Sequence, residues 1–142
     1  MVPLINYWAV ILATVASMVV GAVYYHPRVL GRRWMALTGH TDESIEVGSP
    51  MVYPLVIVAS FITAWVLAGA TYLAHEFYGG GYLLNALLTG LILWLGFTAA
   101  RVLVHDLFDT RPLALTVVTA LNELLTVLVM ALVIGLWSPN LG

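Results

Sequence analysis

Four long apolar stretches dominate this sequence and constrain its fold more than any other feature. They cover residues 3–25, 51–74, 83–104 and 113–137. A helix rises about 1.5 Å per residue and the hydrocarbon core of a bilayer is about 30 Å thick, so each stretch is long enough to cross it. We therefore predict an all-α polytopic membrane protein, a single domain over residues 1–142 that forms a bundle of four transmembrane helices.

The composition excludes other classes of protein. Charged residues make up only 8% of the chain, whereas an ordinary soluble domain carries about 25%, so the chain has too little charge to cover a water-facing surface. A net charge of −2 argues against nucleic acid as a partner, because such proteins present a basic surface. The sequence has no cysteine, which removes disulfides, thiolate catalysis and cysteine-based metal sites.

All five basic residues fall on one side of the predicted bundle. Three lie in the first loop and two lie in or beside the third: Arg28, Arg32, Arg33, Arg101 and Arg111. Positively charged residues accumulate in cytoplasmic loops. We therefore expect loops 26–50 and 105–112 to face the cytoplasm and both chain termini to lie outside.

Glu123 is the residue that most clearly suggests a function. It lies about 15 Å into the fourth stretch, where an ionisable side chain costs about 3 kcal/mol and marks a functional site by default. At about 100° per residue it shares an arc of about 120° with other polar residues. Together they form a polar stripe: Thr116, Thr119, Asn122, Glu123 and Thr126. The opposite side, rich in Leu and Val and including Val118, is expected to face lipid.

Two interpretations of the polar stripe remain open. As a functional site, it would bind a proton or a cation at Glu123. As a structural feature, Glu123 would be protonated or hydrogen-bonded and would hold helices together. Its partners would then be hydroxyl groups at similar depth in the first two helices: Thr14, Ser17, Ser60 and Thr63.

Arg101 is the obvious charge partner for Glu123, but the two residues do not match in depth. If the third and fourth helices form a hairpin, about 9 Å separates them along the helix axes. We expect Arg101 to extend to the cytoplasmic interface or to pair with Asp106 or Asp109.

A short interfacial helix is predicted within the first loop, over residues 28–38. Leu30, Trp34 and Leu37 recur at helical spacing, and arginines lie between them. As a functional site, this segment would contact anionic lipid headgroups through Arg28, Arg32, Arg33 and Trp34. The alternative is a topology signal that attracts lipid without specificity.

Small residues recur every four positions in the first two helices. They form two ladders: Ala9, Ala13, Ser17 and Gly21 in the first, and Ser60, Ala64 and Ala68 in the second. Such ridges let helix backbones approach closely. Packing within the bundle and an interface between copies of the chain both account for them.

The four histidines do not form a convincing ligand set. Neither HExxH nor another local ligand spacing occurs. His26 and His105 are expected near one interface with Asp106 close by, which leaves a membrane enzyme or cofactor protein as a third hypothesis. We expect no metal, no cofactor and no catalytic residue.

Two segments resemble the signature of a known family of membrane proteins. The first is Gly21-Ala22-Val23-Tyr24-Tyr25-His26-Pro27, followed by Leu30-Gly31-Arg32-Arg33-Trp34-Met35 and Gly39. The second is Leu107-Phe108-Asp109-Thr110-Arg111-Pro112-Leu113, with Gly135-Leu136-Trp137 near the end of the chain. They are similar to the family catalogued as domain of unknown function 1761. The resemblance implies a four-helix integral membrane protein of prokaryotic type, and thus a bacterial cytoplasmic membrane, but no activity.

For function, the sequence favours a non-enzymatic membrane protein that forms homo-oligomers or binds a membrane-protein partner or membrane lipids. The small-residue ladders, the arginine-rich segment and the lack of a catalytic pattern support this hypothesis. The alternative is a small proton-linked transporter or channel that uses Glu123.

Overall fold

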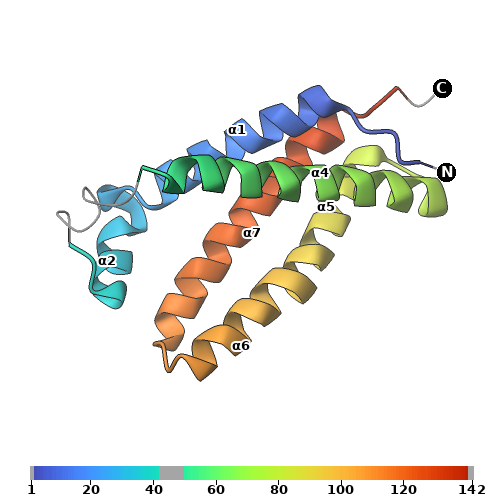
Figure 1. The fold of residues 1–142 in the computed structure, drawn as a ribbon. Helices are drawn as coiled ribbons and strands as arrows, with labels where there is room; N and C mark the ends of the chain where they lie inside the picture. The colour runs from blue at the N-terminus through green and yellow to red at the C-terminus, as the bar shows by residue number, and fades with distance from the viewer. Residues whose placement is uncertain (1, 42–49, 141–142) are drawn as a thin grey trace.

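The computed structural model describes residues 2–41 and 50–140, so residues 42–49 of the predicted first loop lie outside the described chain. Within the described residues every regular element is helical (Figure 1). In chain order the elements are α1 (Tyr7–Tyr24), the π-helical turn η1 (Pro27–Gly31), α2 (Arg32–Thr38), α4 (Val52–Tyr78), α5 (Tyr82–Leu93), the π-helical segment η2 (Trp94–Ala99), α6 (Ala100–Phe108) and α7 (Leu113–Leu136).

Four of the helical segments are long and apolar enough to cross a membrane. They are Tyr7–Tyr24, Val52–Tyr78, Tyr82–Phe108 and Leu113–Leu136. The third of these joins α5, η2 and α6 into one continuous segment. The structure therefore confirms the predicted all-α fold with four membrane-spanning helices, and η1 and α2 occupy the place of the predicted interfacial helix.

Local chemistry explains where the helices differ from the predicted ranges. Helix α1 begins only at Tyr7 because the side-chain oxygen of Asn6 accepts hydrogen bonds from the backbone N–H groups of Trp8 and Ala9, at 3.1 and 3.2 Å. Helix α4 continues to Tyr78, where Gly79 ends it with a positive φ of 67°.

Helices α1 and α7 run antiparallel and are linked by two side-chain hydrogen bonds. At one end the side-chain amide of Asn6 donates to the carbonyl oxygen of Trp137 at 3.2 Å. At the other end the hydroxyl of Tyr24 donates to the carbonyl oxygen of Val118 at 2.6 Å. Figure 1 shows both termini and the α4–α5 turn on one side of the molecule, and α2 and the α6–α7 turn on the other.

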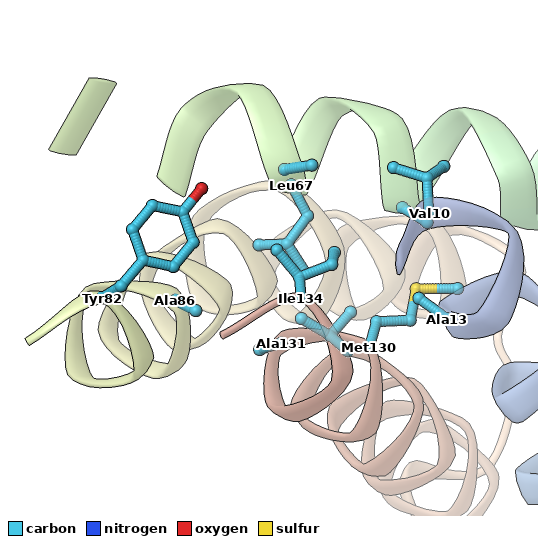
Figure 2. Close-up of a cluster of buried hydrophobic side chains, with 11 residues drawn as sticks. Val10, Ala13, Leu67, Tyr82, Ala86, Met130, Ala131 and Ile134 are labelled. Atoms are coloured by element: carbon cyan, nitrogen blue, oxygen red, sulfur yellow. The ribbon is translucent and has the colours of Figure 1, made fainter. Parts of the chain in front are cut away.

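The hydrophobic core lies in the half of the bundle nearer the termini. Figure 2 shows side chains of α1, α4, α5 and α7 meeting there, with Leu67, Met130 and Val10 fully buried. Small residues let α5 and α7 approach closely, because a Cβ at Gly135 would lie 2.8 Å from the Cα of Leu83.

The small-residue ladders face the interior of this bundle. Ala9, Ala13 and Ser17 of α1 are 1%, 0% and 3% exposed, and Ala64 and Ala68 of α4 are also buried. Of the two explanations for the ladders, packing within the bundle is therefore sufficient.

The other half of the bundle is open because α4 diverges from it. Figure 1 shows α4 crossing α7 at a wide angle. All residues from 52 to 59 of α4 are exposed, whereas the buried residues of this helix lie between Ala64 and Tyr72. This divergence leaves space between the helices beside Glu123.

Candidate functional site

A cavity of about 580 Å³ lies between α1, α4 and α7 on the side where α4 diverges. The polar stripe contributes Asn122, Glu123 and Thr126 to its wall. The rest of the wall comes from α1 and the residue after it, from α4, and from two more residues of α7: Ser17, Met18, Gly21, Ala22, Tyr25, Val52, Tyr53, Val56, Ala59, Ser60, Thr63, Val127 and Met130. We call this space the Glu123 cavity.

Small residues keep the cavity open. Gly21, Ala22 and Ala59 line it with little or no side chain. A Cβ added at Gly21 would meet nothing within 4 Å. Its volume lies within the range of about 300–1,000 Å³ that is usual for small-molecule sites.

The charge of the cavity comes from Glu123, since every other lining residue is uncharged or a phenol. Asn122 beside it is 8% exposed, and its side-chain oxygen has no hydrogen-bond partner among the described residues. A buried amide oxygen without a donor costs free energy, but this oxygen is inaccessible to water and so does not itself face the open cavity.

The hydroxyl groups of the cavity add oxygen acceptors. The hydroxyl of Ser17 donates to the carbonyl oxygen of Thr14 at 2.6 Å, and that of Thr63 donates to the carbonyl oxygen of Ala59 at 3.0 Å. Because each proton is used in these bonds, the oxygens retain lone pairs for a donor or a cation. The cavity thus combines one carboxylate with several neutral oxygens.

Tyr25 also lines the cavity, although it was not among the candidate site residues predicted from the sequence. It follows the first span, and burial raises the pKa of its phenol to about 12, with smaller contributions from the charge of Glu123 and from Tyr24. Its phenol therefore stays protonated at neutral pH and can donate a hydrogen bond.

The structure divides the predicted polar stripe into parts. Thr116 does not line the cavity; its hydroxyl donates to the carboxylate of Asp106 on α6 at 2.7 Å. Thr119 does not line the cavity either. Of the partners expected for Glu123, Ser17, Ser60 and Thr63 do line the cavity, whereas Thr14 bonds to the carbonyl oxygen of Val10.

The apolar side of α7 is also less uniform than expected. Val117, Leu121 and Leu125 are exposed as predicted. Val118 is only 5% exposed, because the Tyr24 ring packs over α7 and its hydroxyl bonds to the Val118 carbonyl. The expectation that Val118 faces lipid was therefore wrong.

Arg111, and not Arg101, forms the ion pairs with Asp106 and Asp109. Its guanidinium lies 3.9 Å from the carboxylate of Asp106 and 3.3 Å from that of Asp109. Arg101 is exposed and forms no ion pair within the described part of the chain. The α6–α7 turn is thus stabilised by its own arginine.

The arginine-rich segment is also divided. Trp34 lies between two rings, 5.5 Å from Tyr25 and 5.0 Å from His40, measured between ring centroids. Arg33 borders an apolar groove against α7, whereas Arg28 and Arg32 are exposed outside it. Of the four predicted lipid contacts, Arg33 therefore lines this groove, and Arg28, Arg32 and Trp34 do not.

Two of the four histidines form polar contacts with neighbouring residues in the described part of the chain. His26 accepts a hydrogen bond from the backbone N–H of Arg28 through Nδ1, at 3.2 Å, and so caps η1. His105 lies 3.9 Å from Asp109. Residues 2–41 and 50–140 contain no group of three or more His, Cys, Asp or Glu side chains that could hold a metal ion.

Residues 21–39 and 107–113 of the resemblance form the end of α1, η1, α2 and the α6–α7 turn, whereas Gly135-Leu136-Trp137 lies at the other end of α7. A Cβ at Gly31 would lie 2.1 Å from the carbonyl oxygen of Tyr25, so glycine is required where η1 folds back on the end of α1. A model for the family of proteins of unknown function DUF1761 matches residues 8–135. The chain belongs to the DUF1761 family.

In this DUF1761 protein the matched residues include all four spans except the first residue of α1 and the last of α7. No curated protein matches the chain significantly, and no solved structure does. Because the family has no assigned activity, function has to be argued from the cavity itself.

Proposed function

We propose that this DUF1761 protein is a non-enzymatic membrane protein that binds a small, partly apolar cation in the Glu123 cavity and exchanges it for a proton across the membrane. The single observation that supports the proposal is the position of Glu123 and Asn122 on the wall of a cavity of about 580 Å³. Glue between helices requires contact with another helix, and among the described residues Glu123 forms no hydrogen bond or ion pair with one.

The chemistry of the wall supports a cation as the ligand. A carboxylate in an apolar layer is costly unless a proton or a positive charge compensates it. The hydroxyl oxygens of Ser17 and Thr63 would accept hydrogen bonds from the same ligand. Proton and cation would then compete for Glu123, which is the basis of exchange.

The remaining wall favours an organic cation over a metal ion. Met18, Val56, Val127 and Met130 present apolar surface to the cavity. Such surface stabilises an alkyl or aromatic group but provides no ligands for a metal. A protonated amine or quaternary ammonium ion with an apolar part satisfies both sides of the site.

Ethidium, an aromatic organic cation, is a suitable probe. We expect saturable binding to the wild-type protein in nanodiscs, followed by fluorescence, and a loss of about tenfold or more in affinity for Glu123→Gln. Glu76→Gln is the matched control, because Glu76 is an exposed carboxylate on α4 that does not line the cavity. Equal affinities for the three proteins would contradict the proposal.

Transport is tested separately in proteoliposomes. An imposed proton gradient should drive ethidium flux with the wild-type protein and with Glu76→Gln, but not with Glu123→Gln. Binding without flux would restrict the function to binding. Should Glu123→Gln instead lose assembly or unfold in detergent, Glu123 would be a structural residue, as the second interpretation of the stripe holds.

A second candidate function is assembly through α4. Residues 52–59 are apolar for the most part, and no other described element covers them. Lipid normally covers the apolar side chains of a membrane span, so a homo-oligomer, or a complex with another membrane protein, would replace lipid on this half of the helix. The mass of the particle in nanodiscs distinguishes a monomer from an oligomer.

The proposed location is a bacterial cytoplasmic membrane with both termini outside. Arg28, Arg32, Arg33 and Arg111 all lie in elements at the same end of the bundle, which supports this orientation under the positive-inside rule. Because the sequence has no cysteine, Phe108→Cys and Gly81→Cys would report the sides of the α6–α7 turn and the α4–α5 turn by their reactivity with an impermeant thiol reagent.

A further inference from the structure

A second cavity, of about 370 Å³, forms a groove between α2 and the first half of α7. It does not share a lining residue with the Glu123 cavity. Its walls come from the end of α1, from η1 and α2, and from one face of α7: Tyr24, Leu30, Arg33, Leu113, Ala114, Val117, Val118 and Leu121. We call this space the Arg33 groove.

The groove follows the axis of α7. Leu113, Val117 and Leu121 recur every four residues and so form one stripe, about 12 Å long, from the α6–α7 turn towards the middle of the helix. These three side chains are 63%, 50% and 45% exposed. The stripe therefore offers an elongated apolar surface that runs inward from the end of a membrane span.

Among the residues that line the groove, the guanidinium of Arg33 is the polar side-chain group that has no partner in the described part of the chain. The hydroxyl of Tyr24 is already bonded to the carbonyl oxygen of Val118, so Tyr24 contributes mainly its ring. Arg33 is exposed, and it forms no ion pair in the part of the chain that the structure describes. One guanidinium thus stands beside an otherwise apolar channel.

We propose that the Arg33 groove binds one anionic phospholipid, with the phosphate at Arg33 and an acyl chain along Leu113, Val117 and Leu121. A guanidinium matches the geometry of a phosphate and binds it through paired hydrogen bonds. The acyl chain fits because it is apolar, elongated and attached to the phosphate at one end. The phosphate groups of membrane phospholipids lie at the membrane interface, which is where a membrane span ends.

The location of the groove also separates this site from non-specific attraction to the membrane. Arg28 and Arg32 carry the same charge in the same segment but do not line the groove. General attraction would depend on all three arginines to a similar degree. A bound lipid depends on Arg33 in particular.

The test compares lipid retention in native mass spectrometry after extraction from bilayers of phosphatidylglycerol and phosphatidylcholine. We expect the wild-type protein to retain phosphatidylglycerol in preference, and Arg33→Gln to lose about tenfold of that retention. Arg32→Gln is the matched control and should retain it as the wild type does. Equal losses in Arg32→Gln and Arg33→Gln would overturn the site.

A second variant tests the acyl chain. Val117→Trp fills the groove without a change of charge, and because Val117 is 50% exposed the larger ring leaves the bundle packing intact. We expect it to lose retention as Arg33→Gln does. Leu132→Trp, at an exposed position of α7 outside the groove, is the control. Full retention by Val117→Trp, or displacement of the lipid by inorganic phosphate alone, would show contact with the headgroup only and overturn the groove.

Discussion

Tyr24 at the end of α1 donates a hydrogen bond of 2.6 Å to the backbone carbonyl oxygen of Val118 on α7. Together with the bond from Asn6 to Trp137, it holds α1 against α7 at both ends. Residues 52–59 of α4 have no comparable contact and remain exposed. The Glu123 cavity therefore forms between a fixed pair of helices and a third helix that diverges from them.

Tyr24→Phe should destabilise the protein by about 1 kcal/mol. The substitution removes one buried hydrogen bond and keeps the ring, which is 6% exposed, in place. Thermal unfolding in detergent micelles measures the change. Tyr25→Phe is the control, because no hydrogen bond from the Tyr25 hydroxyl occurs among the described residues, and it should unfold close to the wild type. Equal effects would mean that the Val118 bond contributes nothing.

Gly31→Ala should destabilise the turn after α1 by about 3 kcal/mol. The new Cβ would lie 2.1 Å from the carbonyl oxygen of Tyr25 and 2.9 Å from its carbonyl carbon, so the backbone itself has to move. Gly96→Ala is the control, since a Cβ there meets nothing within 4 Å. The difference in unfolding temperature between the two variants is the measurement. A neutral Gly31→Ala would show that the turn tolerates displacement.

The sequence predicts the four spans because length and hydropathy act locally along each helix. It also predicts the angular position of Glu123, since about 100° per residue fixes which residues share a face. The residues that surround this face of α7 depend on the angles at which the helices cross. Contacts between residues far apart in the sequence set those angles. Asp106 lies ten positions before Thr116, yet the α6–α7 turn brings them to 2.7 Å and removes Thr116 from the site.

The Glu123 cavity is the clearest case of a feature that the sequence alone does not predict. Residues 52–59 of α4 are as apolar as the rest of that helix, so their pattern gives no sign that they stand away from α7. Tyr25 continues the helical spacing of Ser17, Gly21 and Ala22, and its backbone N–H still bonds to the carbonyl oxygen of Gly21, so this periodicity was the signal for it. The sequence does contain two signals for the cavity. They are the small residues Gly21 and Ala22 of α1 and the small residues Ala59 and Ser60 of α4.

Tyr25 provides a prediction about pH. Its folded-state pKa of about 12 lies above the value near 10 for an unperturbed tyrosine, so the folded protein binds this proton more tightly than the unfolded chain. The resulting stability is complete below about pH 10 and is lost as the pH rises through 12. Ultraviolet absorbance of tyrosinate should lose a late-titrating component in Tyr25→Phe.

The same titration probes the neighbourhood of Tyr25. Glu123 contributes to the raised pKa of Tyr25 through its charge, after burial. Glu123→Gln should therefore move the late component to lower pH without abolishing it. A titration unchanged by Glu123→Gln would place the carboxylate too far from Tyr25 for the two to share a ligand.

A matched pair of threonines on α7 tests how the polar stripe is divided. Thr116→Val should cost about 2 kcal/mol, because it leaves the buried carboxylate of Asp106 without its 2.7 Å hydrogen bond. Thr119→Val should stay within about 0.5 kcal/mol, since Thr119 forms no side-chain hydrogen bond among the described residues. Unfolding in detergent measures both variants, and neither should change ethidium affinity, because neither residue lines the Glu123 cavity. A loss of ethidium binding in Thr119→Val would extend the site along the whole stripe and contradict this division.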